Sequence, residues 1–229
     1  MKAMILAAGR GERLRPLTDE TPKPLIEAGG RPLIGWHLER LAAAGFNEVV
    51  INVAWLPEKI VDALGDGSRW GVEIIYSRED WPALETGGGI YRALSALGQS
   101  PFLVVNGDVW TDLDLAALRL PPGALAHLVM VPNPPHNPGG DFRLNDGRLH
   151  GDDRTGGTLL TYSGIGVFDP ALFADARPGR FPLAPLLRSA MDLDRVTGQR
   201  HDGQWHDIGT PERLAALKQQ LDRRSAPAS

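Results

Sequence analysis

A polar loop rich in glycine and basic residues follows a short apolar segment at the start of the chain. The segment KAMILAA (residues 2–8) has the character of a strand buried on both faces of a parallel sheet, and the loop after it carries Gly9, Gly11, Arg13 and Lys23. Glycine lets backbone amides approach phosphate oxygens closely, and the basic side chains add positive charge. Open α/β folds bind ligands at the carboxyl ends of their strands, so this loop predicts a phosphate-binding site.

The better-known phosphate-binding loops fit this sequence poorly. The segment GRGERL (residues 9–14) lacks the third glycine of the dinucleotide fingerprint, and no acidic residue ends the next apolar run, EVVINV. A GxxxxGK[ST] motif is also missing from the sequence. On residue type alone, a simple strand-to-helix turn with solvated basic side chains remains an equal alternative.

Two aspartates far apart in the sequence could hold a divalent metal ion. Asp108 follows the apolar run FLVVNG, and Asp207 lies in WHDIG. Two carboxylates together with phosphate oxygens make the all-oxygen environment that magnesium prefers. A lone aspartate after a strand is more often a turn or cap residue, and the neighbouring His206 is not part of an HExxH pattern. Residue type therefore leaves both roles open.

The composition limits the class of protein. The chain has 229 residues, 42% of them hydrophobic, and can bury the core of one full domain. Its net charge of -4 argues against a basic face for nucleic acid, and its lack of cysteine excludes disulfides and thiol nucleophiles. The sequence shows no secretory signal and no run of about 18 apolar residues. We therefore expect a cytoplasmic protein that binds neither nucleic acid nor membranes.

Alternating strand and helix patterns predict an α/β fold. Strand-like runs at 48–53, 72–77 and 102–107 alternate with helical patterns at about 34–45, 56–65 and 88–97. This alternation predicts a Rossmann-like, mostly parallel mixed sheet flanked by helices. The remaining expected elements are a strand over 158–168, a helix over 183–191, a hairpin over 200–208 and a helix over 211–221.

We expect a single domain over residues 1–224. Residues 132–157 are rich in proline, glycine and polar residues, with NDG as a turn between two short strands. We interpret this segment as a small β-rich flap beside the site. Residues 225–229 are expected to form a loose tail.

Four motifs together resemble those of the sugar-1-phosphate nucleotidyltransferases, the pyrophosphorylases that make nucleotide sugars. The segment LAAGRGERLRPLTDETPKPL (residues 6–25) fills nearly every position of the family signature, which combines LAAG or LAGG, a glycine, an arginine, PLT and PKP. The segments ETGGG (85–89), VNGDV (105–109) and WHDIGTPE (205–212) follow in the family's order. The resemblance therefore extends over nearly the whole chain.

The resemblance implies a direct transfer of a nucleotidyl group. A sugar 1-phosphate oxygen attacks the α-phosphorus of a nucleoside triphosphate and pyrophosphate leaves, a reaction that depends on positioning and charge stabilisation rather than on a protein nucleophile. Lys23 is expected on an exposed loop that Pro22 and Pro24 stiffen, and Arg15 as surface charge. The implied roles are phosphate contacts by the catalytic residues Arg13 and Lys23, nucleotide binding by Leu6, Ala7, Ala8, Gly9, Gly11, Thr86 and Gly87, magnesium binding by Asp108 and Asp207, and sugar binding by Asp141, Tyr162, Ser163 and Gly164.

The sugar-binding side departs from the family pattern. Many relatives carry a VEKP segment where this chain has GDDRTGG (residues 151–157), which leaves open whether Asp152, Asp153 or Arg154 substitutes. Within the family, the short length and the segments ETGGGI and VNGDVWTD resemble uridylyltransferases of cell-wall recycling. This resemblance implies UTP and a phosphorylated amino sugar with a carboxylate as substrates. Arg143 and Arg154 are then candidate partners of that carboxylate.

Other functions remain to be weighed against this one. A mannose-1-phosphate guanylyltransferase or a cytidylyltransferase is the runner-up, because a few hydrogen bonds decide base preference. A non-catalytic, nucleotide-sugar-sensing subunit is disfavoured because Arg13, Lys23, Asp108 and Asp207 occur together. The carboxyl-terminal β-helix domain by which several relatives trimerise is absent, so we expect a monomer.

Overall fold

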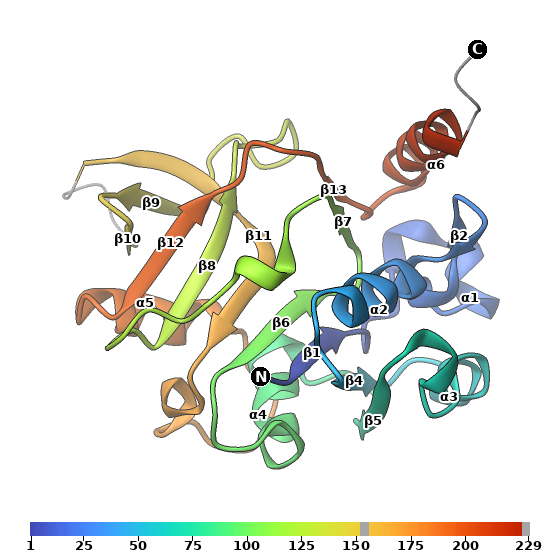
Figure 1. Cartoon of the computed structure of the whole chain (residues 1–229), viewed down its shortest axis with the longest axis horizontal. Coiled ribbons are helices and arrows are strands. Elements are labelled where there is room, and N and C mark those ends of the chain that lie inside the picture. The colour runs from blue at the N-terminus through green and yellow to red at the C-terminus, as the bar shows by residue number, and fades with distance from the viewer. Residues whose placement is uncertain (152–155, 226–229) are drawn as a thin grey trace.

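The computed structural model describes residues 1–151 and 156–225 of the chain (Figure 1). None of the described helices is both long and apolar enough to cross a membrane. In chain order the helices and strands are β1 (Ala3–Leu6), α1 (Leu17–Glu20), β2 (Glu27–Ala28), β3 (Arg31–Pro32), α2 (Leu33–Ala43), β4 (Glu48–Val53), α3 (Pro57–Leu64), β5 (Glu73–Arg78), α4 (Glu85–Leu97), β6 (Phe102–Asn106), β7 (Val109–Thr111), β8 (Ala126–Val131), β9 (Phe142–Asn145), β10 (Arg148–His150), β11 (Thr158–Phe168), α5 (Ala184–Asp192), β12 (Val196–Arg200), β13 (Trp205–Asp207) and α6 (Pro211–Ser225).

Four parallel strands form the half of the sheet that carries the amino-terminal loop. β1 lies between β4 and β6, with Ala3 level with Val49 and Leu103, and β5 extends the sheet beyond β4. The connections between these strands pass through α2, α3 and α4, as crossovers between parallel neighbours require. The expected α/β fold with a mixed sheet flanked by helices is confirmed.

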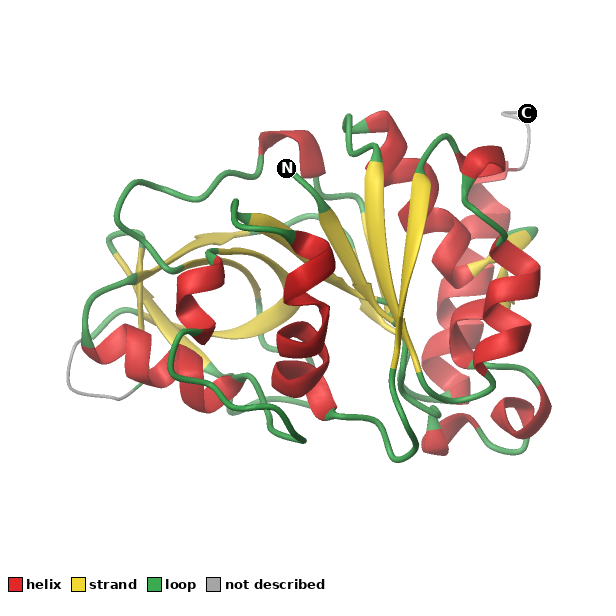
Figure 2. Cartoon of the chain, turned by 90° about the horizontal axis from the view of Figure 1, so that it is seen from below, coloured by secondary structure: helices red, strands yellow, loops and turns green. Residues whose placement is uncertain are grey.

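Helices cover both faces of this parallel half (Figure 2). Side chains alternate along β1, so Ala3 and Ile5 pack with α2 and α3 on one face, and Met4 packs with α4 on the other. All three side chains are fully buried. A strand that is covered on both faces needs an unbroken apolar run, which explains the segment KAMILAA.

The other half of the sheet is mainly antiparallel and closes on itself. β11 pairs antiparallel with β6, β8 and β9, and β12 pairs parallel with β8. β10 joins β12 to β9, so the pairings β11–β8–β12–β10–β9–β11 form a ring. Among the described residues, four strand pairings of this sheet are parallel and five are antiparallel, so the expectation of a mostly parallel sheet holds only for the first half. Most connections after β6 are hairpins or loops rather than crossover helices, which favours antiparallel pairing.

The segment expected to form a flap supplies β9 and β10 to this ring. Asp146 and Gly147 connect the two strands with φ angles of 46° and 77°, the left-handed backbone that a two-residue hairpin needs, which confirms the NDG turn. Motion of this segment as a flap stays a prediction. Asp152, Asp153 and Arg154 lie outside the described residues, as do residues 226–229 of the expected tail.

The prediction of a hairpin over residues 200–208 is wrong. β12 pairs with β8 and β10, whereas β13 pairs with β7, so the two strands leave the turn toward different partners. Asp112, directly after β7, holds the segment between β12 and β13 next to that strand. Its carboxylate accepts hydrogen bonds from the Gln204 amide at 2.8 Å and from His201 Nε2 at 3.0 Å. Residues 201–204 therefore carry the chain away from the ring and back to the carboxyl edge of the parallel strands.

The last helix packs against the first loop. Leu214, Leu217 and Leu221 of α6 join a buried apolar cluster with Leu14 and Ile26 of the amino-terminal segment. Figure 1 shows α6, the last helix in the sequence, beside β2, which is near the start of the sequence. The two ends of the sequence thus support one side of the carboxyl edge of the sheet.

His37 of α2 is a buried titratable group beneath that edge. Burial, with a smaller contribution from Arg40, lowers the pKa of His37 from 6.5 to about 4, against the opposing effects of Asp108 and backbone hydrogen bonds to Gly107 and Val109. Between pH 6.5 and 4 the unfolded chain binds a proton at this site that the folded protein does not bind. The free energy of unfolding therefore falls as the pH is lowered through this window.

We expect the His37 imidazole to stay neutral in the folded protein down to about pH 4. The loss of stability from this group between pH 6.5 and 4 is expected to be about 3 kcal/mol at most. NMR titration of the His37 ring, alongside urea unfolding at several pH values, measures both quantities. A ring that titrates near pH 6.5 in the folded state would contradict this prediction.

Candidate active site

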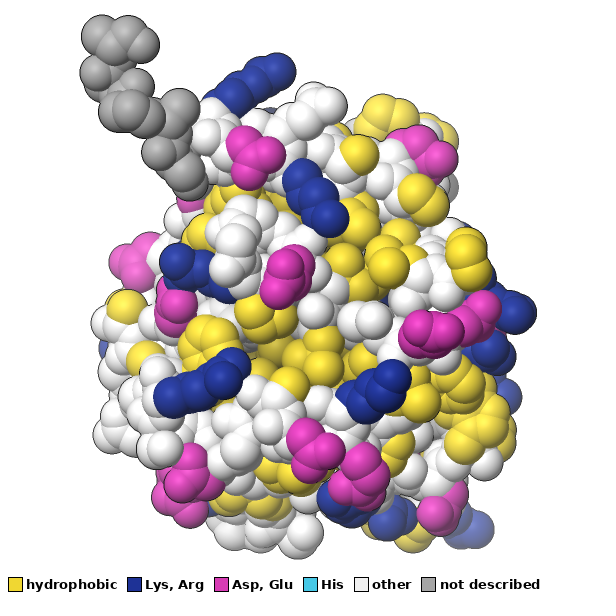
Figure 3. Space-filling view, turned by 90° about the vertical axis from the view of Figure 1, so that its right-hand side faces the viewer, with side chains coloured by type: hydrophobic (Ala, Val, Ile, Leu, Met, Phe, Trp, Pro, Cys, Tyr) yellow, Lys and Arg dark blue, Asp and Glu magenta, His cyan; other side chains and the backbone are white. Residues whose placement is uncertain are grey.

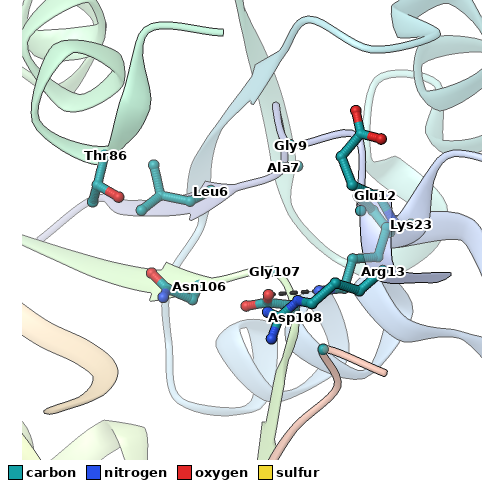
Figure 4. Close-up of a pocket in the computed structure, with 13 residues that line it drawn as sticks. Leu6, Ala7, Gly9, Glu12, Arg13, Lys23, Thr86, Asn106, Gly107 and Asp108 are labelled. Atoms are coloured by element: carbon teal, nitrogen blue, oxygen red, sulfur yellow. Dashed lines mark hydrogen bonds and ion pairs between the residues drawn. The ribbon is translucent and has the colours of Figure 1, made fainter. Parts of the chain in front are cut away.

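A cleft of about 290 Å³ lies at the carboxyl ends of the parallel strands (Figure 4). Leu6 at the end of β1, Asn106 at the end of β6 and Thr86 at the start of α4 line one part of it, and Arg13, Lys23 and Asp108 line the other. A second cavity of about 170 Å³ shares Leu6, Gly9 and Thr86 with the cleft. The two spaces are thus neighbours at the carboxyl edge of the parallel strands, where the sequence analysis predicted a site.

The two glycines of the loop after β1 have different roles at the cleft. Gly11 has a φ of 73°, and a Cβ there would lie 3.2 Å from both Thr18 and Lys23, so glycine is required. The Gly11 carbonyl accepts hydrogen bonds from the Leu14 amide and the Thr18 hydroxyl. At Gly9 no atom lies within 4 Å of the Cβ position. Gly9 therefore leaves open space, whereas Gly11 allows the turn.

Lys23 and Asp108 form the closest charged contact in the cleft. Lys23 Nζ donates to Asp108 Oδ2 at 2.6 Å, and the lysine side chain is only 11% exposed. The expectation of an exposed loop lysine was wrong: Lys23 lies in a tight turn between Pro22 and Pro24 that directs its side chain inward. A buried ammonium needs such a partner, because its desolvation is costly. The structure thus joins a predicted catalytic cation to a predicted metal ligand.

The ribbon of β7 and β13 brings Asp207 to the same place. Asp207 pairs with Val109 across the ribbon, and the Ile208 amide donates to the carbonyl of Asp108 at 2.8 Å. Asp207 Oδ2 accepts from Arg213 Nη1 at 2.7 Å and lies 3.1 Å from His136 Nε2. Two aspartates that are distant in the sequence are therefore neighbours in the fold.

The chemistry of these two aspartates fits a divalent metal ion whose other ligands come from elsewhere. Each carboxylate keeps its Oδ1 without a hydrogen-bond partner among the described residues. Over the same residues, no group of three or more His, Cys, Asp or Glu side chains could hold a metal ion. The protein can thus offer two hard oxygen ligands, as in magnesium sites that phosphate oxygens and water complete.

Arg13 places an unpaired cation at the wall of the cleft. Within residues 1–151 and 156–225 its guanidinium has no hydrogen-bond or ion-pair partner. It lies so close to Gly209 that a Cβ there would be 2.8 Å from Arg13 Nη2 and 2.3 Å from Arg213 Nη2. Gly209 is thus the position at which two guanidinium groups can approach each other. An unpaired guanidinium at a cleft is available for bidentate contact with phosphate.

The ETGGG segment has a structural role at each glycine. A Cβ at Gly87 would lie 2.6 Å from the Phe181 ring, and one at Gly88 would lie 2.2 Å from the carbonyl oxygen of Gly179. Thr86 borders both cavities, but Gly87 is not among the residues that line either of them. The nucleotide-binding role of Thr86 has support from its position, whereas Gly87 is explained by close packing.

The four predicted sugar-binding residues lie together but do not line the cleft. Both oxygens of Asp141 are engaged, with the Tyr162 amide at 2.8 Å and Asn137 Nδ2 at 3.1 Å. Ser163 is 1% exposed, and Gly164, with a φ of 80°, packs against the side chain of Asn106. Burial raises the pKa of the Tyr162 phenol above its usual range. Their sugar-binding roles stay predictions.

The sequence analysis missed several residues of the site. Asn106 and Glu12 line the cleft, and Arg213 and His136 contact Asp207. The sequence could have indicated Asn106, because this residue ends β6 directly before Gly107 and Asp108. No local pattern indicates His136 and Arg213, since only the fold brings their segments to Asp207. Arg143 lies in β9, where its Nη1 donates to the Gly157 carbonyl at 3.3 Å.

The fold and the cleft together define a protein that handles nucleotides. Residues 2–119 match the family model described as Nucleotidyl transferase, which covers more than half of the chain. The chain belongs to this family, and the resemblance to the sugar-1-phosphate nucleotidyltransferases is confirmed. It is 56% identical over 220 residues to the N-acetylmuramate alpha-1-phosphate uridylyltransferase of Neisseria meningitidis, a match that covers 93% of this chain and 95% of that protein.

Two further comparisons bear on substrate and fold. The mannose-1-phosphate guanylyltransferase of Mycobacterium tuberculosis is 41% identical over 116 residues, which are 51% of this chain and 32% of that protein. A putative glucose-1-phosphate thymidylyltransferase from Bacillus anthracis, solved in complex with sucrose, has the same fold, with a TM-score of 0.84 at 20% identity over 100% of this chain and 97% of that one.

The different roles of Gly9 and Gly11 predict different effects of adding a methyl group. Gly11→Ala should lower the free energy of unfolding by about 1–3 kcal/mol, because alanine is strained at positive φ. Gly9→Ala should change it by less than about 1 kcal/mol, since the Cβ position is open and the backbone is ordinary. Urea unfolding of the two variants measures the difference. Equal losses would contradict the assignment of only one glycine to the turn.

Proposed function

We propose that the chain transfers the uridylyl group of UTP to N-acetylmuramate α-1-phosphate and releases pyrophosphate, a step in the recycling of peptidoglycan. The observation that carries this proposal is the full-length match to a uridylyltransferase with this acceptor, combined with a cleft that has the cations and carboxylates for nucleotidyl transfer. The match to a guanylyltransferase covers only half of the chain and therefore supports the alternative less.

In the proposed reaction, a phosphate oxygen of the sugar 1-phosphate attacks the α-phosphorus of UTP. The bond from that phosphorus to the oxygen bridging to the β-phosphate breaks, and pyrophosphate carries away the electron pair. No bond to the protein forms, so the chain contributes position and charge. Leu6, Gly9 and Thr86 line both cavities, whereas Arg13 and Lys23 line only the cleft, which supports an arrangement with the base and ribose near the first three residues and the phosphates near the two cations.

Each charged residue has a role that follows from its position. Lys23, at 2.6 Å from Asp108, is placed to contact the α-phosphate or the sugar phosphate while staying near the carboxylate. Arg13 has no partner among the described residues and lines the cleft, and in the proposed reaction it stabilises charge on the leaving pyrophosphate. Asp108 and Asp207 would hold a magnesium ion through their Oδ1 atoms, and the ion would neutralise phosphate charge.

The non-catalytic alternative requires a fold that has lost its charged groups. In this chain the four charged residues converge from three distant segments, and Arg13 and Lys23 both line the cleft with Asp108. This convergence favours an enzyme over a sensor. The cytoplasmic location, the monomeric state and the roles of Arg143 and Arg154 toward the acceptor's lactyl carboxylate stay predictions.

The proposed metal ligands lead to a prediction about magnesium. Asp108→Asn and Asp207→Asn should each raise the magnesium concentration for half-maximal rate and lower the maximal rate, because an amide keeps the shape but removes the charge. Titration of the uridylyltransferase rate with magnesium measures both effects. Asp112→Asn is a matched control, since an asparagine Oδ1 at position 112 can still accept from the Gln204 amide. A variant that titrates like the parent would remove its residue from the proposed ligand set.

The choice of substrates is tested by a matrix of four nucleoside triphosphates against a panel of sugar 1-phosphates. UTP with N-acetylmuramate 1-phosphate should have the highest kcat/KM when the reaction is followed by pyrophosphate release. N-Acetylglucosamine 1-phosphate lacks the lactyl group and serves as the matched comparison. Equal or better use of that sugar, or a preference for GTP or CTP, would overturn the specific assignment and leave nucleotidyl transfer in place.

A further inference from the structure

A buried pair of polar side chains connects two walls of the cavity next to the cleft. Asn52 in β4 is 3% exposed, and Glu79, which follows β5, is 7% exposed. Asn52 Nδ2 donates to Glu79 Oε1 at 2.7 Å. Both side chains line the cavity that shares Leu6, Gly9 and Thr86 with the cleft. Polar groups buried at this depth must be satisfied by hydrogen bonds, and these two satisfy each other.

The pair also holds a backbone amide at each end. The Ala7 amide, one residue beyond β1, donates to Asn52 Oδ1 at 2.7 Å. The Leu84 amide, one residue before α4, donates to Glu79 Oε2 at 2.8 Å. The four groups form one continuous chain of hydrogen bonds from Ala7 to Leu84. This chain spans from the glycine-rich loop to the first turn of the ETGGG helix.

Two features of the start of α4 depend on these hydrogen bonds. Glu85 has a φ of 63°, which is unusual for a residue with a side chain. The residue before it, Leu84, is held by the hydrogen bond that its amide donates to Glu79 Oε2. A Cβ at Gly89 would lie 2.8 Å from both Asn52 Nδ2 and Glu79 Oε1. The third glycine of ETGGG thus lets the helix backbone pack directly on the pair. The position of Thr86 between these two points is set by both contacts.

We infer that Asn52 and Glu79 are positioning residues for the nucleoside triphosphate. Their hydrogen bonds fix the spacing between the loop after β1 and the start of α4, the two walls that border the compartment for base and ribose. The side chains act through Ala7 and Thr86 rather than on the reacting phosphorus. This inference rests on the proposed function, in which those walls bind the nucleotide.

The direction of the hydrogen bonds makes the inference testable, because the amide of Asn52 and the carboxylate of Glu79 can be exchanged by mutation. Both ends of this series of hydrogen bonds are backbone N–H donors, so the two side chains between them must together offer three acceptors and one donor. Asn52 with Glu79 meets this condition. In Glu79→Gln an amide nitrogen faces either Asn52 or Leu84, and if Asn52 flips, its own amide nitrogen faces Ala7. In Asn52→Asp two carboxylates face each other. The double variant Asn52→Asp/Glu79→Gln restores every bond with the donor and acceptor of the central contact exchanged.

Each single variant should raise KM for the triphosphate roughly tenfold, the order of an unsatisfied buried polar group. KM for the sugar phosphate should change far less, and the double variant should return to within about threefold of the parent. Thr197→Val is the control, because it removes a hydrogen bond of 2.9 Å between β12 and His127 of β8, in the closed half of the sheet. This variant should lower the free energy of unfolding without changing KM for the triphosphate. Single variants that lose stability but keep the parental KM would overturn the inference, as would a double variant without rescue.

Gly89→Ala covers the case in which a single variant does not fold. Its methyl group would displace the pair by contact with Asn52 and Glu79, so KM for the triphosphate should rise by a similar factor; an unchanged KM would overturn the inference. All variants are assayed with the triphosphate that the parent uses best. Failure of the proposed function then shows in the parent, as absence of transfer, and failure of the inference shows in the ratio of variant to parent.

Discussion

The active-site region depends on the buried contact between Lys23 and Asp108. Leu6 and Asn106 are level in the register of β1 and β6, so the segments that follow these parallel neighbours leave the sheet side by side. A lysine with 11% exposure is stable there only with an anionic partner, and the aspartate at 2.6 Å supplies it. The same aspartate precedes β7, whose pairing with β13 brings in Asp207. One ion pair therefore joins the loop, the sheet and the carboxyl-terminal ribbon.

The amino-terminal loop is stabilised from outside itself. Gly11 allows its turn, but Leu14 and Ile26 pack in a cluster with Leu214 and Leu217 of α6. Apolar burial of this kind adds to the hydrogen bonds that the loop makes within itself, such as those to the Gly11 carbonyl. The molecular surface over this side, viewed in Figure 3, shows apolar side chains between scattered charged ones. The first and last segments of the chain are therefore interdependent parts of one domain.

The two ends of the site are held by different interactions. At the end where we propose that the phosphates bind, Arg13 is exposed and the Asp108 side chain is 37% exposed, so both can contact a substrate. At the other end, Asn52 and Glu79 are almost fully buried and bond to each other and to the amides of Ala7 and Leu84. Hydrogen bonds in such surroundings are directional and tolerate little displacement. This division suits a reaction in which phosphate charge changes while the base must stay in place.

The parallel half of the sheet and the position of the glycine-rich loop at its carboxyl edge could be predicted from the sequence, because apolar periodicity and the glycine-rich segments are local patterns. The sequence also indicated that Asp108 lies at the edge of the sheet. The sequence did not predict the separate partners of β12 and β13, the ring around β11, the burial of Lys23 or the contacts of Asp207 with Arg213 and His136. Each of these depends on which distant segments pack together, and no local pattern carries that information. The Asn52–Glu79 pair shows the same limit, since an asparagine in one strand and a glutamate after the next become a unit only when the sheet aligns them.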